Sequence, residues 1–214
     1  MALNKLKFNS INVTPAASEA LKFNSSANGF ETGAAGGAMT FISKQTASSS
    51  STISFTSGID STYKEYIFLF NNIHPGTDGT RFTFQGDTGT NTNYNQTIQS
   101  IFFYGQEGES SDPLLAYGSG QDQQLGTGFQ DLSLGIDSDG NDSNCCGHLH
   151  IFNPSSTTFA KQFLGLTALV GNGYYSYSNY SAGYFNTTNA LTRFQFKMTS
   201  GNIDSGTITL YGIN

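Results

Sequence analysis

The sequence consists largely of short segments in which apolar and polar residues alternate. Phe194, Phe196 and Met198 alternate with Gln195 and Lys197, and the same period of two recurs along most of the chain after residue 38. Such alternation places successive side chains on opposite faces of a β-strand. Turns rich in Gly, Asn, Asp and Ser separate the segments, and no segment is convincingly helical. The pattern therefore restricts the chain to an all-β fold.

About ten strands are predicted. They cover residues 39–45, 52–56, 63–73, 81–85, 97–104, 129–136, 147–152, 159–170, 191–198 and 207–213. The apolar run at residues 66–70 is typical of a strand that is covered on both faces. Short strands in this number favour two packed sheets, and we expect a jelly-roll-like antiparallel β-sandwich.

Composition and charge exclude several classes of protein. Aromatic residues make up 14% of the chain and charged residues only 11%, which is the reverse of a disordered composition. No Lys or Arg occurs between Arg81 and Lys161, although that stretch contains nine acidic residues. Binding to phosphates needs clustered cations, so we expect no nucleic-acid partner. No apolar run is long enough to cross a membrane, and no signal peptide is evident, so we also expect no membrane insertion.

The N-terminal segment contains the same pentapeptide twice. Leu6-Lys7-Phe8-Asn9-Ser10 recurs as Leu21-Lys22-Phe23-Asn24-Ser25. Two such units are too few to form a self-supporting repeat array. We therefore expect residues 1–36 to form an extended anchoring arm that binds other chains through Leu6, Phe8, Leu21 and Phe23, with a hinge at residues 31–38 and the sandwich at residues 37–214. The alternative is a disordered tail.

Five of the eleven tyrosines lie between residues 174 and 184. Tyr combined with Ser, Gly and Asn is the composition of adaptable binding loops. One interpretation is a recognition surface formed by Tyr174, Tyr175, Tyr177 and Tyr180 on an exposed loop, where the rings could stack on sugars. The other is a structural contact between strands or subunits. We expect the flank at Tyr184 to be strand and residues 174–180 to be exposed.

Two segments contain potential metal ligands. Asp137, Asp139 and Asn141 place oxygen atoms at alternate positions, as at the start of a calcium loop, but His148 stands where that loop needs a Glu. His148 and His150 would share one face of a strand and could meet around a threefold axis. The alternatives are a polar turn and two ordinary strand histidines, and no cofactor is expected.

Neither the cysteines nor the carboxylates predict an enzyme. Cys145 and Cys146 are adjacent, so on a strand they would face opposite sides and remain unpaired. No nucleophile elbow, phosphate-binding loop or zinc-protease motif is present. Glu107, Glu109 and Asp112 could imitate a glycosidase pair, but they lie in a turn-rich loop where carboxylates are usually solvated.

Several tracts resemble a family of virion structural proteins of marine tailed bacteriophages. They include the duplicated arm, residues 72–75, 152–156 and 182–188, and the ending at residues 194–213. The resemblance spans nearly the whole chain and implies a non-enzymatic tail fibre, head fibre or decoration protein. It implies no catalytic residues. We expect a homotrimer that contacts other virion proteins, is assembled in the host cytoplasm and is displayed on the virion. The alternative is a receptor- or glycan-binding module for host recognition.

Overall fold

The structure is a computed structural model that describes residues 19–34, 38–138, 142–171 and 173–213. The chain divides into two compact units, residues 1–38 and residues 39–214. All regular secondary structure in the described residues is β-strand, and every strand pair is antiparallel. None of the described residues forms a helix suited to crossing a membrane.

The N-terminal unit contains a β-hairpin. Strand β1 (Glu19–Phe23) pairs with β2 (Phe30–Ala34), and the Asn24 amide donates to the Gly29 carbonyl oxygen at 2.9 Å to close the turn. The second pentapeptide therefore lies in a hairpin, a strand pairing that the sequence did not predict. Residues 31–34 of the expected hinge belong to β2. The first pentapeptide, with Leu6 and Phe8, lies outside the described residues.

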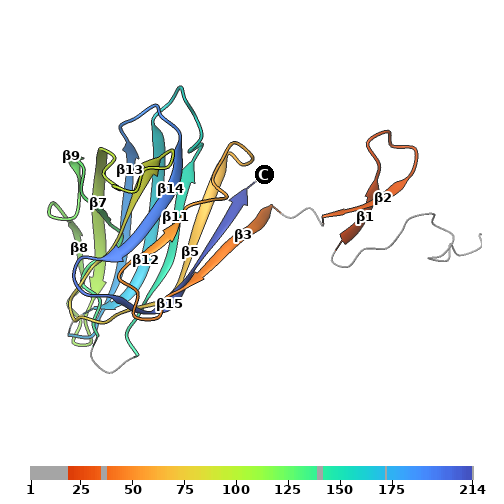
Figure 1. The fold of residues 1–214 in the computed structure, drawn as a ribbon. Coiled ribbons are helices and arrows are strands. Elements are labelled where there is room, and N and C mark those ends of the chain that lie inside the picture. Colours follow the sequence, from red (N-terminus) through yellow and green to blue (C-terminus); the bar gives the residue numbers. More distant parts are fainter. Residues whose placement is uncertain (1–18, 35–37, 139–141, 172, 214) are drawn as a thin grey trace, which may run out of the picture. The chain divides into compact units, whose positions relative to one another are not determined.

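The larger sheet of the second unit has nine strands among the described residues. Their order is β3-β15-β5-β11-β12-β13-β7-β8, and β9 pairs with β7 on the same sheet. Figure 1 shows these strands side by side, with β3 at one edge and β8 near the other. Their bounds are β3 (Met39–Thr46), β5 (Glu65–Pro75), β7 (Ile98–Glu107), β8 (Leu114–Tyr117), β9 (Gln124–Gly126), β11 (Cys145–Phe152), β12 (Lys161–Gly171), β13 (Tyr175–Phe185) and β15 (Ile203–Ile213).

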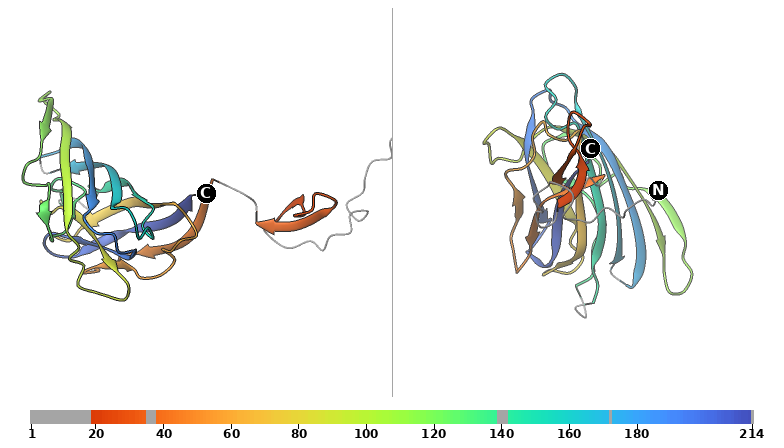
Figure 2. Two further views of the ribbon diagram at one scale, coloured as in Figure 1. Left: turned by 90° about the horizontal axis from the view of Figure 1, so that it is seen from above. Right: turned by 90° about the vertical axis from the view of Figure 1, so that its right-hand side faces the viewer.

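The smaller sheet has four strands in the order β10-β6-β14-β4. Their bounds are β4 (Ile53–Phe55), β6 (Phe82–Thr88), β10 (Gln130–Asp131) and β14 (Leu191–Met198). In Figures 1 and 2 this sheet forms a second layer, and β14 crosses in front of the larger sheet. The predicted all-β antiparallel sandwich is thus confirmed, whereas this strand order does not establish jelly-roll connectivity.

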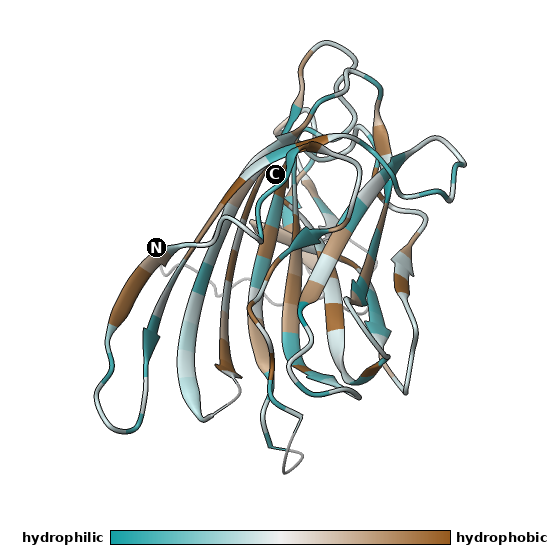
Figure 3. Cartoon of the chain, turned by 90° about the vertical axis from the view of Figure 1, so that its left-hand side faces the viewer, coloured by the Kyte–Doolittle hydropathy of each residue, from teal (hydrophilic) through white to brown (hydrophobic). Residues whose placement is uncertain are grey.

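Phenylalanine side chains fill the space between the sheets. Phe196 on β14 has ring contacts with Phe55, Phe68, Phe70, Phe82 and Phe84, at centroid distances of 5.0–6.4 Å. A second group continues the core toward β12 and β13 and consists of Phe163, Phe185 and Phe194. All of these rings are almost fully buried. Figure 3 shows the alternation of apolar and polar residues along the strands that presents these rings on one face.

Buried polar side chains fasten the loops to the sandwich. The Asp87 carboxylate accepts hydrogen bonds from the amides of Thr88 and Tyr94 and from the Gln96 side chain, at 2.8–3.0 Å. The Gln85 side-chain amide donates to three carbonyl oxygens of neighbouring loops, at 2.8–3.3 Å. A buried carboxylate or amide without such partners would cost several kcal/mol, roughly 2–7 for a neutral group. These buried groups therefore have a structural role.

Several strands differ from the sequence prediction for identifiable reasons. The predicted strand at residues 129–136 is reduced to β10, because the Phe82 amide bonds to the Ser133 hydroxyl at 2.9 Å instead of to a backbone carbonyl. Strand β15 begins at Ile203 and continues through Gly206, which has φ 118° at a register shift. A Cβ at that position would lie 2.5 Å from the Asn72 carbonyl oxygen, so the glycine forms a bulge where a turn was predicted.

We predict that Phe196→Ala destabilises the domain by about 3–5 kcal/mol, because it leaves a cavity where five rings meet. Urea unfolding followed by circular dichroism would measure the loss. The matched control is Phe159→Ala, since Phe159 is 68% exposed and should change stability by less than about 0.5 kcal/mol. Equal losses for the two variants would contradict the central role of the cluster.

Candidate functional site

The tyrosine-rich segment is a strand of the larger sheet. Residues 175–185 form β13, which pairs with β12 on one side and with β7 on the other, so the expected loop is wrong for residues 175–180. The expected exposure holds for Tyr174 and Tyr180 but not for Tyr175 and Tyr177, which are partly buried. Tyr174 lies before the strand with φ 60° and is 60% exposed. The strand is difficult to recognise in the sequence because most of its outward-facing positions carry Ser or Ala, which give a weak periodic signal.

The tyrosines of β13 point to opposite faces of the sheet. Tyr180 faces outward, and its ring stacks on that of Phe103 from β7, with centroids 4.8 Å apart and planes at 8°. Tyr175 and Tyr177 face the other way, and Tyr177 packs against the hydrophobic core. Burial raises the pKa of the Tyr177 hydroxyl. The four candidates therefore do not form one recognition surface, and only Tyr180 lies on the open side of the sheet.

Mostly apolar side chains form rows across the open side of the larger sheet, interrupted at β11 by His148 and His150. Register places Tyr117, Phe103, Tyr180, Leu166, His148 and Leu69 in one row. A second row, two residues along each strand, contains Ile101, Ala182, Leu164, His150, Ile67 and Tyr211. We call this surface, with the adjoining Phe41 and Leu115, the outer sheet face.

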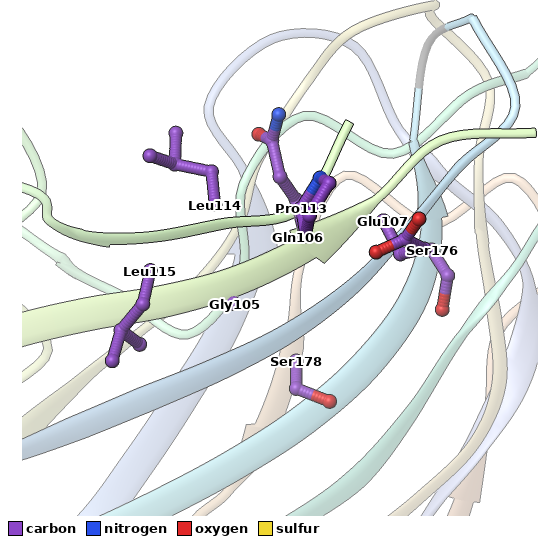
Figure 4. A pocket seen from close by; sticks show the side chains of 8 residues that line it. All are labelled: Gly105, Gln106, Glu107, Pro113, Leu114, Leu115, Ser176 and Ser178. Atoms are coloured by element: carbon purple, nitrogen blue, oxygen red, sulfur yellow. The ribbon is translucent and has the colours of Figure 1, made fainter. Parts of the chain in front are cut away.

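A hollow of about 430 Å³ opens beside the outer sheet face where β7, β8 and β13 meet. Figure 4 shows its lining, with Leu115 and Ser178 on one side of the strands and Leu114 and Gln106 on the other. A Cβ at Gly105 would make only an ordinary van der Waals contact, 3.9 Å from the Leu114 carbonyl oxygen. Glu107 contributes a carboxylate at the strand end. Hydroxyl, amide and carboxylate groups beside an aromatic pair are suited to contact a polar ligand with an apolar face.

The two histidines of β11 lie on the outer sheet face, as their spacing predicted. Their ring centroids are 4.9 Å apart, and His150 Nδ1 contacts the Glu65 carboxylate. Desolvation, with a smaller effect of His150, lowers the pKa of His148. No group of three or more potential metal-ligating His, Cys, Asp or Glu residues occurs among the described residues.

The expected calcium loop is only partly described. Asp139 and Asn141 lie outside the described residues, whereas Asp137 is buried. Both cysteines are free, with Cys145 buried and Cys146 half-buried, as the alternation on a strand predicts. Burial raises the pKa of the Cys145 thiol to about 12, so it remains protonated at neutral pH.

A polar cleft of about 340 Å³ lies over the smaller sheet, and sequence reasoning missed it. Arg81 Nε lies 2.7 Å from the buried Asp131 carboxylate, and Lys197 Nζ lies 4.1 Å from the centroid of the Phe129 ring. Burial raises the pKa of the Asp131 carboxyl to about 7, although Arg81 opposes the shift. Arg81 and Lys197 lie far apart in sequence, and only the pairing of β6 with β14 brings them together.

The carboxylates considered as a glycosidase pair do not lie in that cleft. Glu107, Glu109 and Asp112 are exposed at the end of β7 and in the loop that follows it. The Tyr175 hydroxyl donates to Asp112 Oδ2 at 3.4 Å. Asp131 is the only carboxylate that lines the cleft among the described residues. This arrangement does not provide the two facing carboxyl groups that glycoside hydrolysis normally uses.

The hairpin of the N-terminal unit exposes an apolar face. Phe23 is 66% exposed, Leu21 and Phe30 are each 46% exposed, and the rings of Phe23 and Phe30 stack with centroids 4.9 Å apart. Lys22 and Glu31 form an ion pair at 3.4 Å. Two of the four predicted anchors, Leu21 and Phe23, are therefore available for contact with another surface.

Comparison with known proteins found no matching family model, no matching characterised sequence and no matching solved structure. The resemblance to phage virion proteins therefore remains an expectation from the sequence.

We predict that Asp131 makes the domain less stable as the pH rises from about 4 to about 7.5. Its folded-state pKa of about 7 lies above the ordinary 3.8, so the folded chain retains a proton that the unfolded chain has lost. The stabilising contribution is complete below the ordinary pKa and is lost as the pH rises through 7. A shift of this size corresponds to about 4 kcal/mol at most.

Urea unfolding of the wild-type chain and of Asp131→Asn across this pH range would measure the effect. Titration of His148 affects both proteins and cancels in the difference between them. Stability curves that run parallel for the two proteins would contradict the raised pKa.

Proposed function

We propose that this chain is a non-enzymatic structural protein of a bacteriophage virion, either a fibre or a decoration protein of the capsid or tail. The sandwich would be displayed on the particle, and the N-terminal arm, residues 1–36, would anchor it. The observation that carries the proposal is the separate hairpin with Leu21, Phe23 and Phe30 exposed. An isolated two-stranded hairpin is marginally stable in water, so a docking surface would stabilise it.

The energetics of the arm support anchoring. Fully burying one large apolar side chain contributes roughly 1.5–3 kcal/mol. Because Leu21 is 46% and Phe23 66% exposed in the hairpin, covering them would supply roughly 2–3 kcal/mol before the cost of ordering the segment. The first pentapeptide, with Leu6 and Phe8, would provide a further contribution through a linked contact. Two weak contacts on one segment bind more tightly than either alone because the second becomes intramolecular.

The proposed partners are further copies of the chain, as a homotrimer, and other virion proteins. Low charge and abundant small polar residues suit permanent burial in an assembly. Assembly would take place in the host cytoplasm. We propose no cofactor, no nucleic-acid contact and no membrane insertion, in keeping with the scarcity of cations and the absence of a long apolar run.

We predict that deletion of residues 1–36 leaves a folded sandwich that no longer joins the particle. The reason is that the two units are separate, and all of the proposed anchors lie in the first. Quantitative mass spectrometry of purified particles would count the incorporated copies, and circular dichroism would report folding of the truncated chain. Normal incorporation, or an unfolded truncated domain, would contradict the anchor.

Point variants provide a matched control for this deletion. Phe23→Ala removes an exposed ring from the apolar face, whereas Lys22→Ala removes its neighbour, which pairs with Glu31. We expect Phe23→Ala to reduce incorporation and Lys22→Ala to leave it nearly unchanged.

A second candidate function is recognition of a host surface glycan. The observation that favours it is the stacked pair of Tyr180 and Phe103, each more than a third exposed, beside the hollow that Ser176 and Ser178 line. Aromatic faces stack on the apolar side of sugar rings, and hydroxyl groups bond to the sugar edge.

If this candidate is correct, Tyr180→Ala should abolish adsorption to host cells and binding to glycan arrays without lowering the melting temperature by more than a few degrees. Tyr180→Phe should retain binding, because it keeps the ring. Tyr174→Ala is the control, since Tyr174 is exposed outside β13. Retained binding by a well-folded Tyr180→Ala protein would exclude recognition at this position.

A further inference from the structure

The outer sheet face exposes an unusually large apolar area. The exposed rings are those of Phe41, Phe103, Tyr117, Phe152 and Tyr180, between 37% and 59% exposed. The exposed aliphatic side chains are Met39, Ile101, Leu115, Leu164 and Val170, between 37% and 77% exposed. Taking a whole aromatic side chain as about 150–250 Å², this amounts to roughly 900 Å², compared with about 800 Å² per partner in a standard stable interface. Soluble monomers rarely leave so much contiguous apolar surface in water.

The charges on this face are few and do not oppose self-association. The Glu65 carboxylate contacts His150 Nδ1 on the same face, so it already has a polar partner within the chain. Lys44 lies on the edge strand β3 and Glu107 at the end of β7, near opposite edges of the sheet. A foreign partner is commonly selected by a complementary charge pattern, and this face carries few charges that could form such a pattern.

We propose that the outer sheet face binds the same face of a second copy of this chain. The proposal rests on the self-association included in the proposed function. It names a twofold contact, which closes at two copies, so a homotrimer would need a further contact through another surface. Two identical faces can meet with Lys44 and Glu107 near the edges of the contact, and sheets commonly pack face to face about 10 Å apart. The contact would bury Leu164 from the middle of the sheet together with Tyr180 and Phe103, which the glycan candidate requires to be accessible.

Sedimentation equilibrium of the full-length chain tests the proposal. The wild-type chain should form a stable oligomer at micromolar concentration. Leu164→Glu and Leu115→Glu should each weaken association at least about tenfold, because each places a charge in an apolar interface. Circular dichroism should show an unchanged fold, since both side chains are already about half or more exposed.

Leu114→Glu is the matched control. Leu114 precedes Leu115 on β8, is 44% exposed and points to the opposite side of the strand (Figure 4). The same charge should therefore leave association unchanged. If Leu115→Glu and Leu164→Glu remain as oligomeric as the control, self-association occurs through another surface, and the proposal is overturned while the proposed homotrimer survives. A wild-type chain that is monomeric at all concentrations refutes both the face-to-face contact and the homotrimer. The anchoring arm is tested separately by the deletion of residues 1–36.

The native thiol of Cys146 gives an independent readout. Cys146 is half-buried and lies on the outer face in register with Ala168, next to the row that contains His148. Its reaction with a thiol reagent should slow as the protein concentration rises and the face becomes covered. In Leu164→Glu the rate should stay constant with concentration. Cys145 should not interfere, because its thiol is buried on the other side of the strand. A wild-type rate that is independent of concentration across the assembly transition would overturn the proposal.

Discussion

Contact between phenylalanine rings of the two sheets is the interaction on which the rest of the structure depends. Phe68 on β5 meets Phe55, Phe194 and Phe196 of the smaller sheet, and Phe70 meets Phe82 and Phe196. Offset and edge-to-face contacts of this kind contribute beyond the area that the rings bury. They require the alternate residues of every participating strand to face the same interior, and so they determine which side chains remain on the opposite face.

The two sheets differ in width, and this difference leaves one face of the larger sheet uncovered. Four strands cover one side of a nine-stranded sheet, and no described strand of the sandwich covers the other side. Inside the sandwich, polar groups such as Asp87 and Gln85 bond to loop backbone and hold those loops in place. On the open side, Leu164 and Tyr180 have no comparable cover, and they form an apolar surface suited to association. The fold thus separates a stable interior from a surface available for contacts.

The sequence predicted the strands that alternate strongly and missed those that do not. Residues 191–198 were predicted with the bounds of β14, because Phe194, Phe196 and Met198 give an unambiguous period of two. Strand β13 was partly taken for a loop, since Ser, Asn and Ala occupy many of its positions. The hairpin of β1 and β2 was missed because cross-strand pairing of Phe23 with Phe30 is visible only when both strands are seen together. The Arg81 cleft was missed for a similar reason, because its residues come from distant segments.

The sequence alone determined that this chain is an all-β antiparallel sandwich and that its two cysteines face opposite sides of a strand, because both follow from a period of two along the backbone. Only the tertiary structure decided which tyrosines are accessible, that Asp131 is buried beside Arg81, and that apolar residues of eight strands form one surface. These features depend on strand order and register, which bring together residues far apart in the sequence. Local periodicity specifies the two faces of a strand, but it does not specify which strand lies beside it or which face the second sheet covers.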